Sequence, residues 1–359
     1  MSEHRMNSDF AIPVKSKIEK YFVGEVNLIS SEEAISRDFT LIDVRSPIEY
    51  QSGKIPNALN IPVFDNLERT EIGKIYKELG KEIAFQKGAD FFEPKLDNFL
   101  LKFSKLKSKN IVVYCARGGM RSACLVRILS KNGFTVFQMF GGYKNYRRYV
   151  LEKLKSSTPP LIVLHGKTGV GKTLILQNLP SYIDLEGLAQ HRSSLFGAIN
   201  KIPNNQKNFE SFLVQKLSEF NLEHPVFIEG ESRKVGKVFI PDNIARGMKK
   251  GVFVLLSASM ETRVNRIVEE YKIKDKATVI KIDRILQSLI ISLGKSKIEK
   301  MRKWLKYGEI KKIVHMLLVD YYDPRYNNSM RNYKFELKIS TENIDRATNE
   351  LIDFRKELM

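Results

Sequence analysis

The stretch Gly166-Lys-Thr-Gly-Val-Gly-Lys-Thr173 decides the fold of the second half of this chain. It matches the pattern G-x4-G-K-[ST] and follows an apolar run, Leu161–Leu164, that we expect to be a buried strand. A helix should begin at Lys172, so that backbone N–H groups between strand and helix surround a phosphate. Lys172 would neutralise the phosphate oxygens and Thr173 could hold Mg²⁺. The loop glycines of this diphosphate site are Gly166, Gly169 and Gly171.

The motif is a Walker A phosphate-binding loop (P-loop), but it does not identify the ligand. A nucleotide hydrolase normally places an aspartate at the end of a second strand to hold Mg²⁺. Here the candidate strand, Val226–Ile228, runs into Glu229-Gly-Glu-Ser-Arg233, so two glutamates could serve but the aspartate is missing. No base-recognition motif for adenine or guanine follows. The sequence therefore predicts a diphosphate site and leaves a nucleoside open.

The residues before the P-loop mark a domain boundary. Ser156-Ser-Thr-Pro-Pro160 cannot continue a helix, so we expect two domains, 1–155 and 156–359. A globular chain of 359 residues, 43% hydrophobic and 28% charged, is too long for one ordinary core. Short apolar runs alternate with amphipathic stretches, which indicates parallel α/β sheets. Strands are expected at 40–44, 110–114, 135–139, 226–228 and 252–256, helices at 95–106 and 122–131, and mostly helix after Glu261.

A second loop, Tyr114-Cys-Ala-Arg-Gly-Gly-Met-Arg-Ser122, lies between a predicted strand and a predicted helix. This position aims backbone N–H groups at whatever occupies the loop. Their field, with Arg117 and Arg121, should favour the thiolate of Cys115 and make it a nucleophile. Cys124, on the following helix, is expected to pack as a small hydrophobe. Because Cys-x5-Arg also fits a protein phosphatase loop, attack on phosphorus stays open at this point.

The charge of the chain points to a polyanionic partner. Sixty Lys and Arg against 41 Asp and Glu leave a net charge of +19, and nucleic acid is the usual polyanion attracted by such a surface. A lysine-rich genome could explain part of this excess. The charge is clustered, however: residues 271–312 hold 13 Lys and Arg against four acidic residues. Clustering is typical of a nucleic-acid footprint.

Other classes of protein are disfavoured by composition. Two cysteines do not form a disulfide framework, and five scattered histidines give no zinc spacing, so we expect no structural metal. No apolar run approaches the roughly 18–20 residues of a membrane span. The polar first eight residues lack the apolar core of a secretory signal. We expect a cytoplasmic protein with no membrane association.

The residues upstream of the cysteine loop resemble the rhodanese signature. Asp43-Val-Arg45, Glu49 and Gly53-Lys-Ile-Pro-Asn-Ala-Leu-Asn60 match its conserved pattern, and Phe140-Gly-Gly-Tyr143 resembles the turn that closes that fold. Departures are Lys54, where the family usually has His, and Asn57, where Gly is common. The resemblance covers residues 28–149 and implies that Cys115 handles sulfur or selenium as a persulfide-type adduct. Some phosphatases share the fold, so it does not exclude them.

The pairing of this domain with a P-loop domain resembles tRNA 2-selenouridine synthases along most of the chain. Further matching stretches are Glu68-Arg69 with Gly73 and Tyr76, and residues 184–192, 231–236 and 321–326. The expected fold class is α/β: an N-terminal rhodanese-like parallel sheet and a C-terminal P-loop α/β domain with a helical, basic C-terminal region. Residues implied in substrate binding are Asp184, Glu186, His191, Arg192, Glu231, Ser232 and Arg233.

The resemblance implies a transferase acting on wobble 2-thiouridine in tRNAs for Lys, Glu and Gln. Geranyl diphosphate would alkylate the sulfur, with its diphosphate in the P-loop, and selenium from selenophosphate would then replace the geranylthio group. Cys115 would handle selenium while Arg117 and Arg121 bind selenophosphate. No tightly bound cofactor is implied, apart from Mg²⁺ at the P-loop. The implied tRNA contacts are Lys295, Lys297, Lys300, Arg302, Lys303 and Lys306.

Two alternatives stay open. One is a Cys-x5-Arg phosphatase fused to a nucleotide-dependent kinase-like module. The other is a non-catalytic, nucleotide-gated RNA-binding protein whose rhodanese-like domain is degenerate, although an intact cysteine disfavours it.

Overall fold

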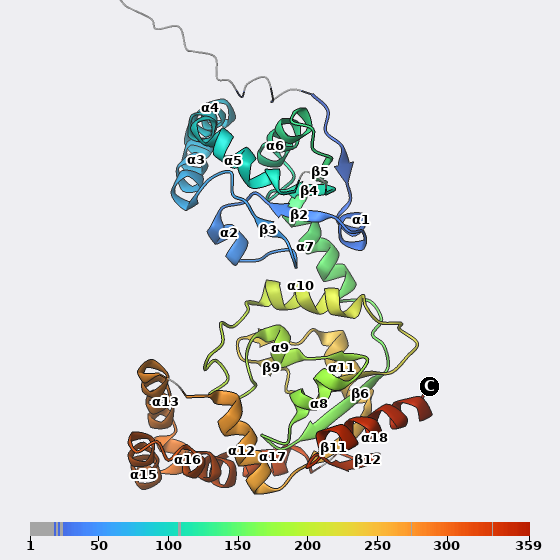
Figure 1. Ribbon diagram of the computed structural model, residues 1–359, viewed down its shortest axis with the longest axis vertical. Coiled ribbons are helices and arrows are strands. Elements are labelled where there is room, and N and C mark those ends of the chain that lie inside the picture. Colours follow the sequence, from blue (N-terminus) through green and yellow to red (C-terminus); the bar gives the residue numbers. More distant parts are fainter. Residues whose placement is uncertain (1–17, 19–20, 22–23, 107–108, 274, 332) are drawn as a thin grey trace, which may run out of the picture. The chain divides into compact units, whose positions relative to one another are not determined.

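The computed structural model describes residues 18, 21, 24–106, 109–273, 275–331 and 333–359 (Figure 1). The chain divides into two compact units between Tyr149 and Val150. This division falls within helix α7 (Gly142–Lys153), a few residues before the linker at which the sequence placed it. Each unit has its own parallel sheet, which confirms the α/β fold class.

The first unit is a five-stranded parallel sheet in the order β1-β5-β4-β2-β3. The central strand, β4 (Ile111–Tyr114), is buried along its whole length, as expected of an Ile-Val-Val run in a parallel sheet. Asp43 pairs with Tyr114, so the loops after β2 and β4 leave the sheet at the same edge. The other strands are β1 (Leu28–Ile29), β2 (Thr40–Asp43), β3 (Leu59–Asn60) and β5 (Val136–Met139).

Helices flank this sheet, and two of them form a hairpin that sequence analysis did not predict. Helices α3 (Asn66–Glu78) and α4 (Lys81–Phe92) pack together around Gly80, whose φ of +93° permits the turn between them (Figure 1). Asp65 caps α3 through the N–H of Glu68 at 2.8 Å. The remaining helices are α1 (Ser31–Ser36), α2 (Pro47–Gln51), α5 (Leu96–Ser104) and α6 (Met120–Lys131).

The second unit is a parallel sheet in the order β12-β11-β6-β8-β7. Its central strand, β6 (Leu161–Gly166), is fully buried and leads directly into the P-loop. Leu164 pairs with Glu229, so the residues after β8 lie at the same edge as the P-loop. The other strands are β7 (Tyr182–Ile183), β8 (Val226–Glu229), β11 (Val252–Ser257) and β12 (Leu337–Ser340), and β9 (Lys234–Val235) pairs with β10 (Val238–Phe239) in a hairpin. The helices beside this sheet are α8 (Lys172–Asn178), α9 (Leu185–Ala189), α10 (Gln206–Leu217), α11 (Asp242–Lys250) and α18 (Ile344–Glu357).

Helices dominate the region after β11, as predicted, and they enclose an apolar core of their own. They are α12 (Met260–Tyr271), α13 (Lys276–Ser288), α14 (Ile290–Leu293), α15 (Lys295–Lys306), α16 (Ile310–Leu317), a π-helical turn (Leu318–Tyr322) and α17 (Asp323–Ser329). The prediction missed the edge strand β12, which is too short to show a clear period of two. Within the described ranges, no helix is both long and apolar enough to cross a membrane.

Candidate functional sites

The cysteine loop holds the Cys115 sulfur among hydrogen-bond donors. Cys115 directly follows β4, and α6 begins five residues later at Met120. The N–H of Gly119 donates to Sγ at 3.3 Å and the hydroxyl of Ser122 at 3.2 Å. These donors favour a negative charge on the sulfur.

The electrostatics of the loop distinguish the two cysteines. Burial raises the pKa of Cys115, but the charge of Arg121, the Ser122 hydroxyl and the backbone N–H groups of Arg117 and Ser122 outweigh it, so the pKa lies below its usual value. Burial raises the pKa of Cys124 to about 12. Cys115 is therefore the thiol that ionises more readily.

The backbone carbonyls of the cysteine loop accept hydrogen bonds from residues outside the loop. The N–H of Tyr143 donates to the Cys115 carbonyl at 2.9 Å, and the Gln138 amide donates to the Gly118 carbonyl at 2.8 Å. At Gly142, a Cβ atom would lie 2.3 Å from the Cys115 carbonyl oxygen, so only glycine fits there. With the carbonyls bound on the outside, the loop N–H groups are left to face the sulfur and its ligand.

The two loop arginines differ in their surroundings. Arg121 forms a two-point ion pair with Glu49, at 2.8 and 3.3 Å, while Arg117 is exposed. If both arginines bind an anion as predicted, Arg121 must interact with Glu49 and with that anion at the same time. Nearby, Arg45 and Asp43 form a fully buried ion pair at 2.5 Å, which explains the Asp-x-Arg signature as a structural requirement.

The P-loop joins β6 to α8 and is held in shape by distant residues. Gly169 and Gly171 have φ of +85° and +91°, which favours glycine at both positions. The guanidinium of Arg263 donates to the Thr168 carbonyl at 2.9 Å, and that of Arg266 donates to the Val170 carbonyl at 2.8 Å. Sequence analysis missed these arginines, because helix α12 lies about 95 residues downstream.

Asp323 connects the P-loop to helix α17. It accepts hydrogen bonds from Arg263 at 2.6 Å and from Lys167 at 3.2 Å. The sequence indicates Tyr321–Tyr326 as a matching stretch but gives it no role. The structure shows helix there, and Asp323 binds both Arg263 of α12 and Lys167 of the P-loop. Lys172 is not part of this network, and its Nζ donates to the Gly166 carbonyl at 2.9 Å.

Four carboxylates lie close together: Asp184, Glu186, Glu229 and Glu231; two of them, Glu186 and Glu231, also feel the charge of Lys172. Ile183 of β7 pairs with Ile228 of β8, which brings the two acidic stretches to one edge of the sheet. The N–H of Glu186 donates to Glu229 at 2.6 Å, while the second oxygen of Glu229 has no hydrogen-bond partner among the described residues. Burial, followed by the charges of Glu186 and Glu231, raises the pKa of Glu229 well above its ordinary value. This burial and the charges of its neighbours make Glu229 less suited than a solvent-facing aspartate to hold a metal ion.

This cluster predicts that stability depends on pH. Burial, then the charge of Glu231, raises the pKa of Glu186 from 4.5 to about 7. A carboxylic acid with a raised folded-state pKa stabilises the fold at low pH, and that stabilisation is lost as pH rises through about 7. Glu186→Gln, which resembles the protonated form, should match the wild type at pH ~5 and be more stable by about 1–2 kcal/mol at pH ~8. Chemical unfolding of both proteins at the two pH values measures this, and equal differences at both would contradict the assignment.

The other predicted substrate-binding residues have partners outside this carboxylate cluster. Arg192 pairs with Glu270 and lies over the ring of Tyr271 at 4.5 Å. Arg233 pairs at the surface with Asp242, and the Ser232 hydroxyl bonds to the Lys234 carbonyl at 2.9 Å. The half-buried His191 packs against Gly197 and Gly236. The structure therefore brings Glu186 and Glu231 close to Lys172, with Asp184 beside these glutamates, but it does not show His191, Arg192, Ser232 or Arg233 in contact with Lys172.

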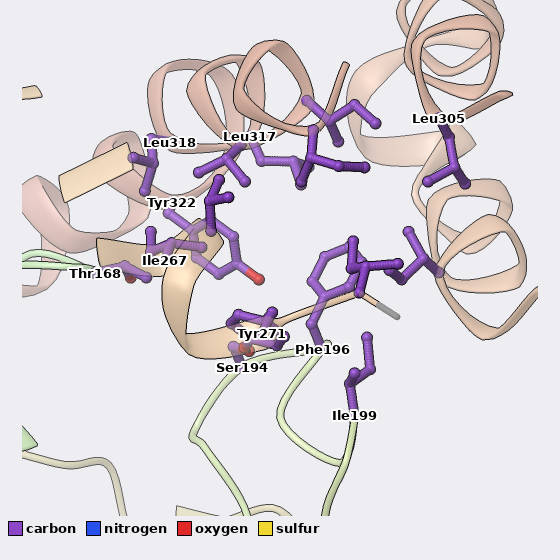
Figure 2. Close-up of a pocket in the computed structure, with 16 residues that line it drawn as sticks. Thr168, Ser194, Phe196, Ile199, Ile267, Tyr271, Leu305, Leu317, Leu318 and Tyr322 are labelled. Carbon is purple, nitrogen blue, oxygen red and sulfur yellow. The ribbon is translucent and has the colours of Figure 1, made fainter. Parts of the chain in front are cut away.

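An apolar cavity borders the P-loop at Thr168 (Figure 2). Its walls come from the loop at 194–199, helices α12, α13, α15 and α16 and the π-helical turn, and its volume is about 70 Å³ in this structure. The hydroxyls of Ser194 and Tyr271 lie 3.2 Å apart and satisfy each other, so little polarity faces the cavity. The apolar side chains around it include Phe196, Ile199, Ile267, Leu305, Leu317 and Leu318.

The predicted tRNA contacts lie on helix α15 and are all exposed. Arg302 pairs with Asp283 at 2.6 Å and Lys297 with Asp320 at 3.0 Å, whereas Lys303 and Lys306 form no ion pair with the described residues. Trp304 is half-buried and packs against the helical core, with Lys300 5.0 Å from its ring centre. One face of α15 is therefore available to a polyanion, while Trp304 serves packing. The remaining predicted contact, Lys295, pairs loosely with Glu299 at 3.8 Å.

The fold and its two loops define a rhodanese-like domain joined to a P-loop domain. Family models agree: a rhodanese-like domain matches residues 27–149, and the tRNA 2-selenouridine synthase AAA domain matches residues 159–354. The chain belongs to the tRNA 2-selenouridine synthase family, which confirms the resemblance predicted from its sequence.

The chain is also similar to individual proteins. A tRNA 2-selenouridine synthase of Hydrogenovibrio crunogenus is 30% identical over 344 residues, covering 86% of this chain and 94% of that protein. One of Nitrosomonas europaea is 33% identical over 245 residues, covering 65% of this chain, and the match spans 64% of that relative's length. A rhodanese-related protein of Thermoplasma volcanium, known by crystal structure, is 23% identical over 34% of this chain and 92% of its own, with a TM-score of 0.22.

Proposed function

We propose that this chain is a tRNA-modifying transferase that converts wobble 2-thiouridine to 2-selenouridine through an S-geranyl intermediate. The observation that carries the proposal is that Thr168 belongs to the P-loop and also lines an apolar cavity (Figure 2). A diphosphate with a hydrocarbon tail suits that pair of surfaces better than a nucleotide does, because a base and ribose need polar partners. Since the cavity is small, about 70 Å³, a ten-carbon chain would enter with a shift of the wall around Phe196.

The first step places geranyl diphosphate in unit 150–359. The sulfur of 2-thiouridine attacks the first carbon of the geranyl group; a carbon–sulfur bond forms, the carbon–oxygen bond breaks, and the electron pair leaves with diphosphate. The base loses its N3 proton. Lys172 and the N–H groups of the P-loop stabilise the charge that develops on the leaving diphosphate. Where Mg²⁺ accompanies the diphosphate, Thr173 is the side chain that would contact it and help to neutralise that charge.

The second step uses Cys115 and selenophosphate. Both the thiolate and the selenium of selenophosphate are nucleophiles, so a direct bond between them would need an oxidant. We assign Cys115 instead to carbon C2, where it displaces geranylthiolate and is then displaced by selenium. The geranylthiolate takes up a proton, and water cleaves the phosphorus–selenium bond to release phosphate. Arg117, Arg121 and the loop N–H groups would hold the selenophosphate anion.

Mass spectrometry of nucleosides tests the proposal directly. Full-length protein with thiolated tRNA for Lys, Glu or Gln and geranyl diphosphate should yield S-geranyl-2-thiouridine, and added selenophosphate should convert it to 2-selenouridine. Reactions with ATP in place of geranyl diphosphate are the control. Release of phosphate from an aryl phosphate that depends on Cys115, without any modified nucleoside, would favour the phosphatase alternative. Tight tRNA binding without product would favour a binding protein.

A further inference from the structure

A cavity of about 1010 Å³ lies beside Cys115, between the cysteine loop and the α3–α4 hairpin. Its inner wall is buried and apolar, and its outer wall is exposed and basic. The inner wall includes Phe64, Ala84, Ala89, Phe92 and Leu125, and the outer wall includes Lys74, Lys77, Lys81 and Arg117. The cavity therefore runs from a cationic surface to the hydrophobic core of this unit.

Chalcogen transfer from a small anion does not account for this space. Selenophosphate would be bound by the N–H groups of the loop and by nearby arginines, and an anion pressed against aromatic side chains would lose its hydration without compensation. Cavities that bury drug-sized ligands measure roughly 300–1,000 Å³. The ligand that fits here is a large hydrocarbon group attached to something anionic.

We propose that this cavity binds the isoprenoid chain of the S-alkylated wobble nucleoside while Cys115 acts on it. The inference rests on the proposed function, whose first step attaches that chain. Cys115 forms part of the cavity wall, so a group whose attached sulfur is displaced at Cys115 must lie in or next to the cavity. The exposed lysines at its outer wall would face the phosphates of the same tRNA.

The cavity then selects the alkylated base over the unmodified 2-thiouridine. Burying one methylene of the chain improves affinity by about fourfold, so an alkylated base is held far more tightly than a bare 2-thiouridine. The α3–α4 hairpin would thus make the second step depend on the first, although neither helix contributes a reacting group.

Filling the cavity tests this inference. Ala84→Phe projects a ring from the inner wall, and Thr70→Phe does so from an exposed position on α3 that tolerates change more readily. We expect each to lower kcat/KM for selenation of S-geranyl tRNA by at least about tenfold, because a shortened apolar wall excludes methylenes of the chain. Geranylation by the same proteins should be unchanged. Ile83→Phe, on the exposed side of α4 and outside the cavity, is the matched control.

A binding measurement separates the cavity from the proposed function. Geraniol, which carries no phosphate, should slow the alkylation of Cys115 by iodoacetamide in full-length wild type but not in Ala84→Phe, as read by peptide mass spectrometry. Tetraethylene glycol, of similar length but polar, should have no effect. Protection by geraniol without any geranylation activity would support the cavity and refute the proposed function. Geranylation with no protection, and with unaltered selenation by the filled variants, would overturn the inference and leave the cavity to another occupant such as a partner protein.

Discussion

Cys115→Ser should abolish selenation of S-geranyl tRNA and leave geranylation at the wild-type rate. The loop lowers the pKa of the thiol, despite its burial, through the charge of Arg121 and hydrogen bonds to the sulfur. A serine hydroxyl in the same place stays protonated at neutral pH and cannot displace geranylthiolate from C2. Loss of a nucleophile of this kind lowers kcat by at least on the order of 10³-fold. The measurement is single-turnover selenation of purified S-geranyl tRNA, followed by mass spectrometry.

Cys124→Ser is the control for this experiment. Cys124 lies on α6 and also borders the cavity, but burial raises its pKa to about 12. Its replacement should alter selenation by less than about threefold. Full selenation by Cys115→Ser would remove the cysteine from the chemistry and leave the loop as an anion site only. Loss of geranylation in the same variant would indicate that the substitution damages the whole chain.

The local motifs made both loops predictable from sequence. Each is a strand, a glycine-rich turn and a helix within about a dozen residues, so the sequence itself carries the geometry. What supports them could not be predicted in this way. Arg263 and Asp323, which fix the P-loop carbonyl of Thr168 and the side chain of Lys167, lie 95 and 156 residues from their partners. Only the packing of α12 and α17 brings them there.

The chemical character of the sites was also hidden in the sequence. Glu229 and Glu231 looked like substitutes for a Mg²⁺-binding aspartate, yet the pairing of β7 with β8 brings Glu186 beside them. Burial and mutual repulsion then raise their pKa values, a result of neighbours that no spacing rule reveals. The apolar cavity at Cys115 was missed for a related reason, since its wall comes from α3, α4 and α6 together.

Lys172→Met should lower geranylation and leave selenation unchanged, which is the opposite of the result expected for Cys115→Ser. Lys172 is the side chain of the P-loop that would meet the diphosphate, and it donates a hydrogen bond to the Gly166 carbonyl. Methionine keeps the length of the side chain but removes its charge, so the leaving diphosphate loses its main partner. We expect geranylation to fall by about 10²–10³-fold, as when one preorganised donor is removed from a developing anion. Lys249→Met, at the exposed end of α11, should have no effect.

Selenation of tRNA that already carries the geranyl group distinguishes a local defect from a global one. In Lys172→Met this second step should proceed at the wild-type rate, because Cys115 and its cavity belong to the other compact unit. Mixing Lys172→Met with Cys115→Ser should then restore conversion of 2-thiouridine to 2-selenouridine, provided that the S-geranyl tRNA dissociates from one protein and binds the other. Mixing that restores nothing, although each variant performs its own step, would mean that the tRNA passes between the two sites of one molecule without release. Loss of both steps in Lys172→Met would instead place the P-loop lysine in a process that selenation also requires, and the separation of the two reactions between the units would be wrong.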